Sequence, residues 1–409
     1  MSRTPSFLPS YAELRGRDRA ALAAAAALVL IVTGALFVPA GDDPGDGLAP
    51  TTAREYVALD SAPGRGVLTP EAEAEIDRVL ATAPARLSAR VAPTALARDL
   101  VRCAEFEDQQ YCLGVGWTEV TPQQAAGRAL ARPTRPGGET TGDLATADLL
   151  AQRAALPTAE RIAVERAELE EAARSVAKVV LLRHQLLGEP LPEGFLERHP
   201  EARASASTPT SPRKKNKLIK DYPQRSKILN SRQMREQHTT YWCGPTTMQA
   251  IAWGWQGRKR TQRHWARQLG TTTSGTAISD IVRLVNRDTG YDRKKYAGTY
   301  IVLDISDWNF HRWLLLQMRH IHDYRAPVVL HPMLLKKYYP YLDDDASGHF
   351  QVGRGYDKRG DKPPHIGYFE PWNQQRFDPS EPYIRRVQWR DAYKSYRANR
   401  AHPHQNIGV

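Results

Sequence analysis

Cysteine is scarce in this chain, which has three cysteines among 409 residues: Cys103, Cys112 and Cys243. Three cysteines allow one disulfide bond at most within the chain and leave at least one thiol without a cysteine partner. The sequence also has no internal repeat, and one stretch alone is long and apolar enough to cross a membrane. With 41% hydrophobic and 25% charged residues, the remainder has an ordinary globular composition.

Acidic residues are depleted in the second half of the chain. Residues 211–409 carry a net charge of +18 and residues 1–210 a net charge of −6, within a total of +12. Eight of the nine tryptophans also follow residue 240. The two halves are therefore predicted to be different domains. A basic half is compatible with nucleic-acid binding, or alternatively with a surface that suits anionic wall polymers or lipid headgroups.

Charged residues are absent from the apolar run at residues 20–38, AALAAAAALVLIVTGALFV. A helix of about 19 residues spans nearly 30 Å, which is enough to cross a bilayer. Four arginines precede the run and three aspartates follow it closely. The positive-inside tendency therefore predicts a cytoplasmic N-terminus at 1–19, a transmembrane signal-anchor helix at 20–39, and the bulk of the chain outside the cell.

Two other interpretations of this run remain open. Val38-Pro39-Ala40 has the character of a signal-peptidase site, and cleavage after Ala40 would make the protein secreted. A buried, Ala-rich helix of a soluble protein is the second alternative, but it would need apolar partners on every side. In the anchored topology the basic half lies outside the cell. This argues against nucleic acid as a partner and leaves anionic cell-wall polymers as a candidate.

The region after the apolar run is predicted to be mostly helical. Residues 40–52 have the composition of a polar, Gly/Pro-rich linker, and residues 53–195 follow as an extracytoplasmic region. Thr69-Pro70 is a good start for a helix, and Pro157 is expected to divide a long helical stretch into two helices. Residues 196–218 are predicted to be a second linker, or else an extended segment that lies on the neighbouring domain.

Cys103 and Cys112 are predicted to form a disulfide bond. Outside the cytoplasm an oxidised pair is allowed, and closing a loop of about ten residues would stabilise the fold by roughly 2.5–3 kcal/mol on the chain-entropy model. Two free cysteines, or half of a metal site, are the alternatives. No further cysteine or histidine lies nearby in the sequence to complete a zinc site.

Residues 219–409 are predicted to form an α+β domain. Apolar residues that follow Cys243 recur at helical spacing, and Pro245 suits the first turn of that helix. Two further helices and three short strands are then expected, in this order: 278–286, 308–322, 325–331, 348–357 and 365–372. Helices that precede strands are typical of the α+β class.

Cys243 is a candidate nucleophile because it stands just before the predicted helix opened by Gly244-Pro245. Free backbone N–H groups at a helix start stabilise an anion, so the pKa of a thiol there is expected to be lowered. A nucleophilic cysteine requires such activation. The alternative is an inert cysteine that fills a buried apolar position.

A general base and an orienting group must come from elsewhere in the sequence. His349 precedes a predicted strand and is the preferred base, with His331, His365 and His320 as rivals. Glu370 lies at the end of the next strand, where antiparallel pairing could bring it beside His349. The N–H of Cys243 and the side-chain amide of Gln237, six residues earlier, are candidate donors to an oxyanion.

Four short segments, taken in order, resemble the family-39 cysteine peptidases, a group that is related to the papain-like superfamily and includes leader peptidases that cut after a double glycine. The segments are Gln237-x5-Cys243-Gly244-Pro245-Thr246, Gly348-His349-Phe350-x-Val352, Gly355-Tyr356-Asp357 and Phe369-Glu370-Pro371-Trp372. The resemblance covers about residues 237–409. It implies a papain-like fold, in which helices pack on an antiparallel sheet, and a cysteine peptidase activity.

By the same resemblance, Gln237 is the oxyanion donor, Cys243 the nucleophile, His349 the general base and Glu370 the orienting acid. The family usually has Asp at the last position, and the additional methylene of Glu370 moves its carboxylate by about 1.5 Å. Asn373 is therefore an alternative third residue. No phosphate-binding sequence of the G-x-x-x-x-G-K-[ST] type is present, so the chain is not the transporter-fused form, and no cofactor or metal is expected.

The sequence thus predicts a membrane-anchored cysteine peptidase that acts outside the cytoplasm on a peptide or isopeptide bond. An amidase or a transglutaminase-like acyl transferase that acts on cell-wall peptides would use the same residues. A catalytically inactive module that binds peptides or proteins is the third possibility, and Glu370 in place of Asp gives it some support.

Overall fold

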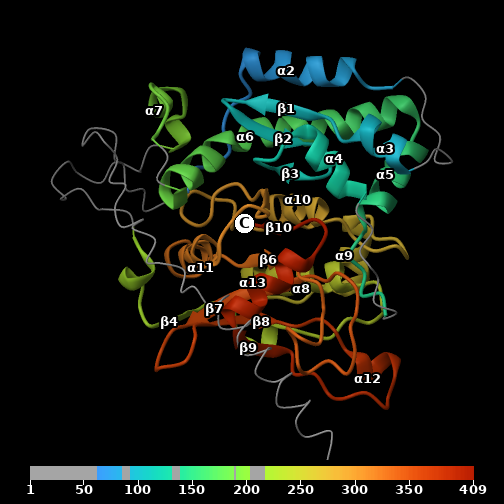
Figure 1. Cartoon of the computed structure of the whole chain (residues 1–409), viewed down its shortest axis with the longest axis vertical. Coiled ribbons are helices and arrows are strands. Elements are labelled where there is room, and N and C mark those ends of the chain that lie inside the picture. Colours follow the sequence, from blue (N-terminus) through green and yellow to red (C-terminus); the bar gives the residue numbers. More distant parts are fainter. Residues whose placement is uncertain (1–61, 85–92, 131–138, 188–189, 203–216) are drawn as a thin grey trace, which may run out of the picture. The chain divides into compact units, whose positions relative to one another are not determined.

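The computed structural model describes residues 62–84, 93–130, 139–187, 190–202 and 217–409, and these described residues all belong to one compact unit (Figure 1). The predicted cytoplasmic segment 1–19, the predicted membrane anchor 20–39 and the linker 40–52 lie outside the described residues. Within the described ranges, no helix has both the length and the apolar character that crossing a membrane requires.

A ten-stranded sheet runs through the unit. The strands follow the order β1-β2-β3-β5-β10-β6-β7-β8-β9, β4 pairs with β7, and β3 and β5 are parallel neighbours. Their bounds are β1 Cys103–Phe106, β2 Gln109–Cys112, β3 Gly116–Trp117, β4 Arg225–Lys227, β5 Val302–Asp304, β6 Val328–Leu330, β7 Gln351–Asp357, β8 His365–Phe369, β9 Val387–Asp391 and β10 Asn406–Gly408. The strands predicted at 325–331, 348–357 and 365–372 are confirmed as β6, β7 and β8.

Helices cover both faces of the sheet, because its strands are apolar on both sides. Val329 and Leu330 are consecutive in β6, so they point to opposite faces and join different apolar clusters. One face carries α8 (Cys243–Gln256), α9 (Gln262–Leu269) and α10 (Ile278–Asp288). The other carries α6 (Thr158–Leu187), α11 (Phe310–Met318), its π-helical extension η4 (Arg319–Asp323) and α13 (Ala392–Ala401). The predicted α+β class is therefore confirmed.

The first region forms the predicted helices but also contributes strands. Thr69 caps α2 (Pro70–Ala81), accepting a hydrogen bond from the Ala72 amide at 3.2 Å, and Pro157 separates α5 from α6, as the sequence predicts. The remaining short elements are α3 Pro93–Leu100, α4 Pro122–Leu130, α5 Thr146–Ala155, α7 Phe195–Arg198, η1 Pro200–Ala202, η2 Ile219–Asp221, η3 Ser231–Gln233 and α12 Gln374–Phe377. α7 and η1 lie at the start of the predicted linker 196–218, most of which is outside the described residues.

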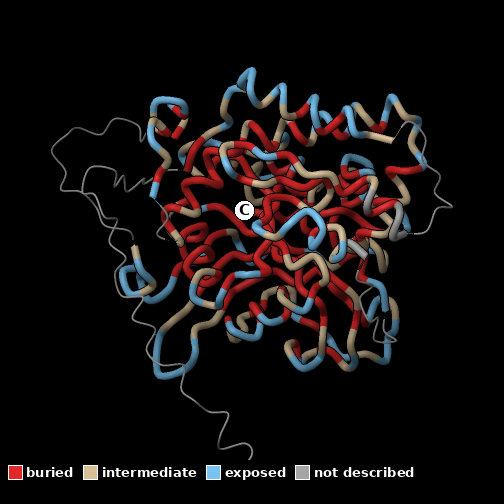
Figure 2. Tube along the Cα trace, turned by 45° about the horizontal axis from the view of Figure 1, so that its top comes forward, coloured by how far each residue is buried: buried red, intermediate tan, exposed pale blue. Residues whose placement is uncertain are grey.

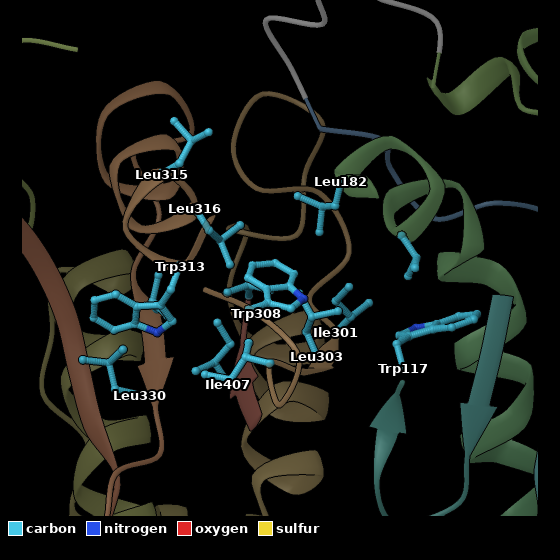
Figure 3. Packing of buried hydrophobic residues seen from close by; sticks show 14 of the residues in the cluster. Trp117, Leu182, Ile301, Leu303, Trp308, Trp313, Leu315, Leu316, Leu330 and Ile407 are labelled. Carbon is cyan, nitrogen blue, oxygen red and sulfur yellow. The ribbon is translucent and has the colours of Figure 1, made fainter. Parts of the chain in front are cut away.

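The two regions that differ in charge share one sheet and one core. Trp117 of β3 pairs with Leu303 of β5, so the meander β1–β3 extends the sheet of the second region. Figure 3 shows Trp117 and Leu182 of the first region in the same apolar cluster as Leu303 and Trp313 of the second. The tube in Figure 2 is accordingly buried through the middle of the unit and exposed mainly at its loops and outer helix faces.

A disulfide bond joins Cys103 and Cys112 in the structure. The two residues stand directly opposite each other in the antiparallel pair β1–β2, which brings their side chains together. The bond closes the hairpin that begins the sheet.

Candidate active site

Cys243 is the first residue of α8 and is fully buried. Backbone N–H groups of Phe350 and of Gly244 hydrogen-bond its sulfur atom. Phe350 directly follows His349, so the thiol lies against the chain that leads into β7. The helix start predicted at Gly244-Pro245 thus delivers the sulfur to the beginning of a central strand.

His349 and Glu370 form a buried pair. His349 Nε2 lies 2.7 Å from Glu370 Oε1, and both side chains are fully buried. The antiparallel register of β7 and β8, which pairs Val352 with Phe369, brings the two residues together from the ends of neighbouring strands. Among the described residues, His349 Nδ1 has no hydrogen-bond partner. An ionised carboxylate accepts the Nε2 proton, so Nδ1 keeps its lone pair and has the form of a general base.

Glu370 is held by four donors. Its Oε1 atom accepts from His349 and from the Trp372 amide at 2.9 Å, and its Oε2 atom accepts from Tyr341 at 2.6 Å and from Gln351 at 2.7 Å. Burial raises the pKa of Glu370, but His349, together with the hydrogen bonds from Tyr341 and the Trp372 amide, outweighs burial and leaves the pKa below its usual value. The additional methylene of Glu370 therefore does not prevent contact with His349. The residue that contacts His349 is thus Glu370 and not the alternative, Asn373, which lies just before α12.

Two of these supporting residues were missed in the sequence. Gln351 stands two residues after His349, so strand alternation places both side chains on the same face, and this spacing could have identified it. Tyr341 comes from the loop before β7 and carries no comparable signal.

Gln237 and Cys243 donate hydrogen bonds to the same carbonyl oxygen, that of Thr141. The distances are 3.2 Å from Gln237 Nε2 and 3.4 Å from the Cys243 amide nitrogen. Gln237 Nε2 also donates to the carbonyls of Thr239 and Thr240, at 3.0 and 3.1 Å. All three neighbours are carbonyl oxygens, which accept hydrogen bonds, so the NH2 group of the Gln237 side chain faces them. The two donors that the sequence assigns to an oxyanion site thus converge on one peptide carbonyl.

The carbonyl of Thr141 belongs to residues 139–144, which we call the covering segment. The segment lies between two loops of the second region: Gly142 O accepts from the Thr276 amide at 2.9 Å, Leu144 N donates to Thr276 O at 2.8 Å, and Glu139 O accepts from the Ser347 amide at 3.0 Å. Thr141 is fully buried. Substrate cannot reach Cys243 while this segment is in place.

Gly142 allows the segment to pass this close. Its φ of +103° is a conformation that favours glycine, and a Cβ atom there would overlap the backbone of Tyr241, two residues before Cys243. The sequence reads as a loop around residue 142 and gave no indication of this contact, because the pairing partners are more than a hundred residues away.

The pKa of the Cys243 thiol is raised well above its usual value. Burial is the main cause, and the negative charge of Asp143 in the covering segment adds to it, while the backbone hydrogen bonds from Phe350 and Gly244 act in the opposite direction. The expected lowering at a helix start is therefore not realised in this conformation. The difference arises because the covering segment excludes water and brings in a carboxylate.

The rival histidines lie elsewhere. His320, in η4, packs against the rings of Tyr300 and Tyr324, and burial lowers its pKa far below the usual value. His365 is the half-buried first residue of β8. His331 belongs to a separate histidine cluster with His402 and His404.

A buried cysteine at a helix start and a histidine paired with a carboxylate are residue types that thiol hydrolases use. Residues 228–401 match the model of the Peptidase_C39 like family. The match includes Gln237, Cys243, His349 and Glu370, and it confirms the resemblance predicted for residues 237–409. Comparison with curated proteins and with solved structures returned no match.

Proposed function

We propose that the chain is a cysteine peptidase with a papain-like arrangement of its second region, and that the covering segment holds it in a closed state. The observation that supports this best is the Thr141 carbonyl, which accepts hydrogen bonds from both Gln237 and Cys243. The site thus already binds a peptide group where the carbonyl of a scissile bond would be placed.

The proposed mechanism assigns one role to each of the four residues. Once the covering segment is displaced, His349 Nδ1 takes the thiol proton and the sulfur of Cys243 attacks a peptide carbonyl. Gln237 Nε2 and the Cys243 amide stabilise the oxyanion, and His349 gives its proton to the leaving amine. Water then hydrolyses the thioester with His349 as base. Glu370 keeps the proton on Nε2 and stabilises the imidazolium that forms.

The place of action is part of the same proposal. The apolar run at 20–39 would anchor the chain, with its second region outside the cytoplasm, and the disulfide Cys103–Cys112 supports an oxidising compartment. The excess of Lys and Arg after residue 210 would favour peptide substrates attached to anionic cell-wall polymers.

Opening the site provides the test. The full-length protein with Gly142→Val is incubated in detergent with a peptide library, and products are read by mass spectrometry. The added side chain cannot fit against Tyr241, so the segment is expected to leave the site and cleavage to exceed that of the wild type. Gly127→Val is the matched control, because Gly127 is exposed on α4 and a Cβ atom there meets nothing within 4 Å.

Adding Cys243→Ala to the Gly142→Val protein is expected to abolish the products. Equal cleavage with and without Cys243 would rule out a thiol mechanism. If Gly142→Val exposes Cys243 to a thiol-reactive probe and still yields no cleavage product, the chain is a binding module and not a peptidase.

A further inference from the structure

Three histidines converge near Gly348, the residue before His349. His331 follows β6, His402 ends α13 and His404 precedes β10. One ring nitrogen from each lies within 4.8 Å of those of the other two, and His331 and His402 are buried. Ligand nitrogens around a tetrahedral zinc ion are about 3.4 Å apart, so small movements of these side chains would close the set.

Asp143 of the covering segment lies beside two of these histidines and is the candidate for a fourth ligand. Its Oδ2 atom lies 2.9 Å from His402 Nε2 and 3.6 Å from His331 Nε2. Gly348 makes room for this contact, since a Cβ atom there would overlap both Asp143 Oδ2 and His402 Nε2. A buried carboxylate surrounded by imidazoles needs a positive charge, which a divalent cation would provide.

The orientation of His331 is that of a metal ligand. Its Nδ1 atom lies 2.8 Å from Asn406 Oδ1, which fixes the proton on Nδ1 and leaves the lone pair on Nε2. Among the described residues, this buried Nε2 atom has no hydrogen-bond partner. A pocket lined by Arg128, Thr146, Asp304 and Asn406 reaches the partly exposed His404 and gives a small ion access to the cluster.

We infer that His331, His402, His404 and Asp143 form a site for Zn²⁺ that fastens the covering segment to the second region. Three neutral imidazoles and one carboxylate complete a tetrahedral shell, so the site is structural and has no open position for chemistry. Since Asp143 is two residues from Thr141, a bound ion would hold the Thr141 carbonyl against Gln237 and Cys243. This consequence rests on the proposed function, whereas the metal site itself does not.

Existing contacts of two of the histidines must change when the ion binds, and one of them joins His404 Nε2 to Thr146 Oγ1. His402 Nε2 faces Asp143, and His402 Nδ1 accepts from the His404 amide at 3.1 Å. Coordination through Nε2 requires the His402 proton to move to Nδ1, and the contact with the His404 amide is given up. The loss of these contacts is small beside the binding free energy of a four-ligand zinc site.

The direct test is a titration with ZnCl2 of full-length Cys243→Ala protein in detergent, after treatment with EDTA. Removing the thiol excludes it as a rival ligand. Calorimetry is expected to show one site per chain with a Kd of about 1 µM or tighter. His331→Ala is expected to weaken binding at least about a hundred-fold. His311→Ala, a change at an exposed histidine outside the cluster, is expected to keep the parent affinity.

Thermal unfolding keeps the test decisive if His331→Ala fails to fold. ZnCl2 is expected to raise the melting temperature of the Cys243→Ala protein, because an ion that binds only the folded chain stabilises it. The absence of both binding heat and a melting shift in that protein would overturn the site.

The fastening is measured separately on protein that retains Cys243. EDTA is expected to speed the labelling of Cys243 by iodoacetamide about ten-fold, and ZnCl2 to slow it again, with neither effect in His331→Ala. Zinc binding without any change in the labelling rate would show that the ion does not hold the covering segment over Cys243. Neither measurement depends on peptide cleavage, so a failure of the proposed peptidase activity leaves both results interpretable.

Discussion

Two carboxylate–histidine groups, Glu370 with His349 and Asp143 with His402, differ in how the charge of the carboxylate is satisfied. Glu370 receives four hydrogen bonds from His349, Gln351, Tyr341 and the Trp372 amide, all within the second region. Asp143 comes from the first region and its ring contacts are with His402 and His331 alone among the described residues. The first group is complete within one domain, and the second is formed only when two parts of the chain meet.

The pKa values in the Asp143–His402 group also reflect its small number of hydrogen-bond donors. Burial raises the pKa of Asp143, but the neighbouring imidazoles of His331 and His402 outweigh burial and leave the pKa well below its usual value. Burial, together with the neighbouring His331, lowers the pKa of His402 to about 4 although Asp143 acts against this. Asp143 therefore has fewer hydrogen-bond donors than Glu370 to offset the burial of its charge.

The largest effect is expected from a change at Glu370, the carboxylate of the candidate catalytic pair. Glu370→Gln, made in the Gly142→Val protein, is expected to lower kcat/KM about 10³- to 10⁴-fold, because His349 loses the acceptor that fixes its proton on Nε2. The loss should fall on kcat and should be smaller than that of Cys243→Ala. A variant with nearly full activity would show that Glu370 only fills space, and Asn373→Ala would then be the informative change.

A smaller effect, an increase in the reactivity of Cys243, is expected from a change at Asp143. Asp143→Asn removes the negative charge that raises the pKa of the Cys243 thiol and weakens the hold on the covering segment. The rate at which iodoacetamide labels Cys243 at pH 7 should rise roughly ten-fold, because a lower pKa leaves more of the thiol ionised and reactive. Asp148→Asn on the neighbouring helix α5 serves as the control. If both variants label at the wild-type rate, Asp143 does not govern the thiol.

The smallest effect concerns a third histidine with carboxylate partners, remote from both groups. Burial lowers the pKa of His199, but hydrogen bonds with Glu107 at 2.5 Å and Glu201 at 2.8 Å outweigh it and raise the pKa to about 9. Because the folded pKa lies above the unfolded one, this stabilisation is fully present below about pH 6.5 and is lost as the pH rises through 9.

The measurement is the melting temperature against pH for wild type and His199→Gln. The variant should melt a few degrees lower at pH 6, and the two curves should converge by pH 10. A difference that stays constant with pH would mean that His199 contributes packing and not charge. Unlike the two central groups, His199 should leave the labelling of Cys243 unchanged.

The sequence predicted those features whose determinants are close together in the chain. Thr69 and Pro157 mark helix ends through their own backbone chemistry, and β6 to β8 are short apolar runs between turns. The four site residues could be named because each belongs to a short motif on an element that the pattern also predicts. Their roles remain those of the proposal.

The features that could not be predicted depend on distant pairing. The covering segment is held by Thr276 and Ser347, and nothing in its composition distinguishes it from an ordinary loop. The pKa of the Cys243 thiol is determined by the covering segment, which buries the thiol, and not by the helix start. It could therefore not be predicted either. The histidine cluster combines three positions that become neighbours only when β6, α13 and β10 are assembled.

The pairing of β3 with β5 has a consequence for competition at the site. Since Trp117 and Leu303 lie in one sheet, displacing the covering segment does not release the first region, and α5 begins only two residues beyond Leu144. The segment therefore acts as an intramolecular competitor, present at an effective concentration on the order of millimolar. A peptide at low concentration in solution would therefore displace the segment poorly. A substrate attached to the same surface as the protein would have a local concentration comparable to that of the segment and could displace it.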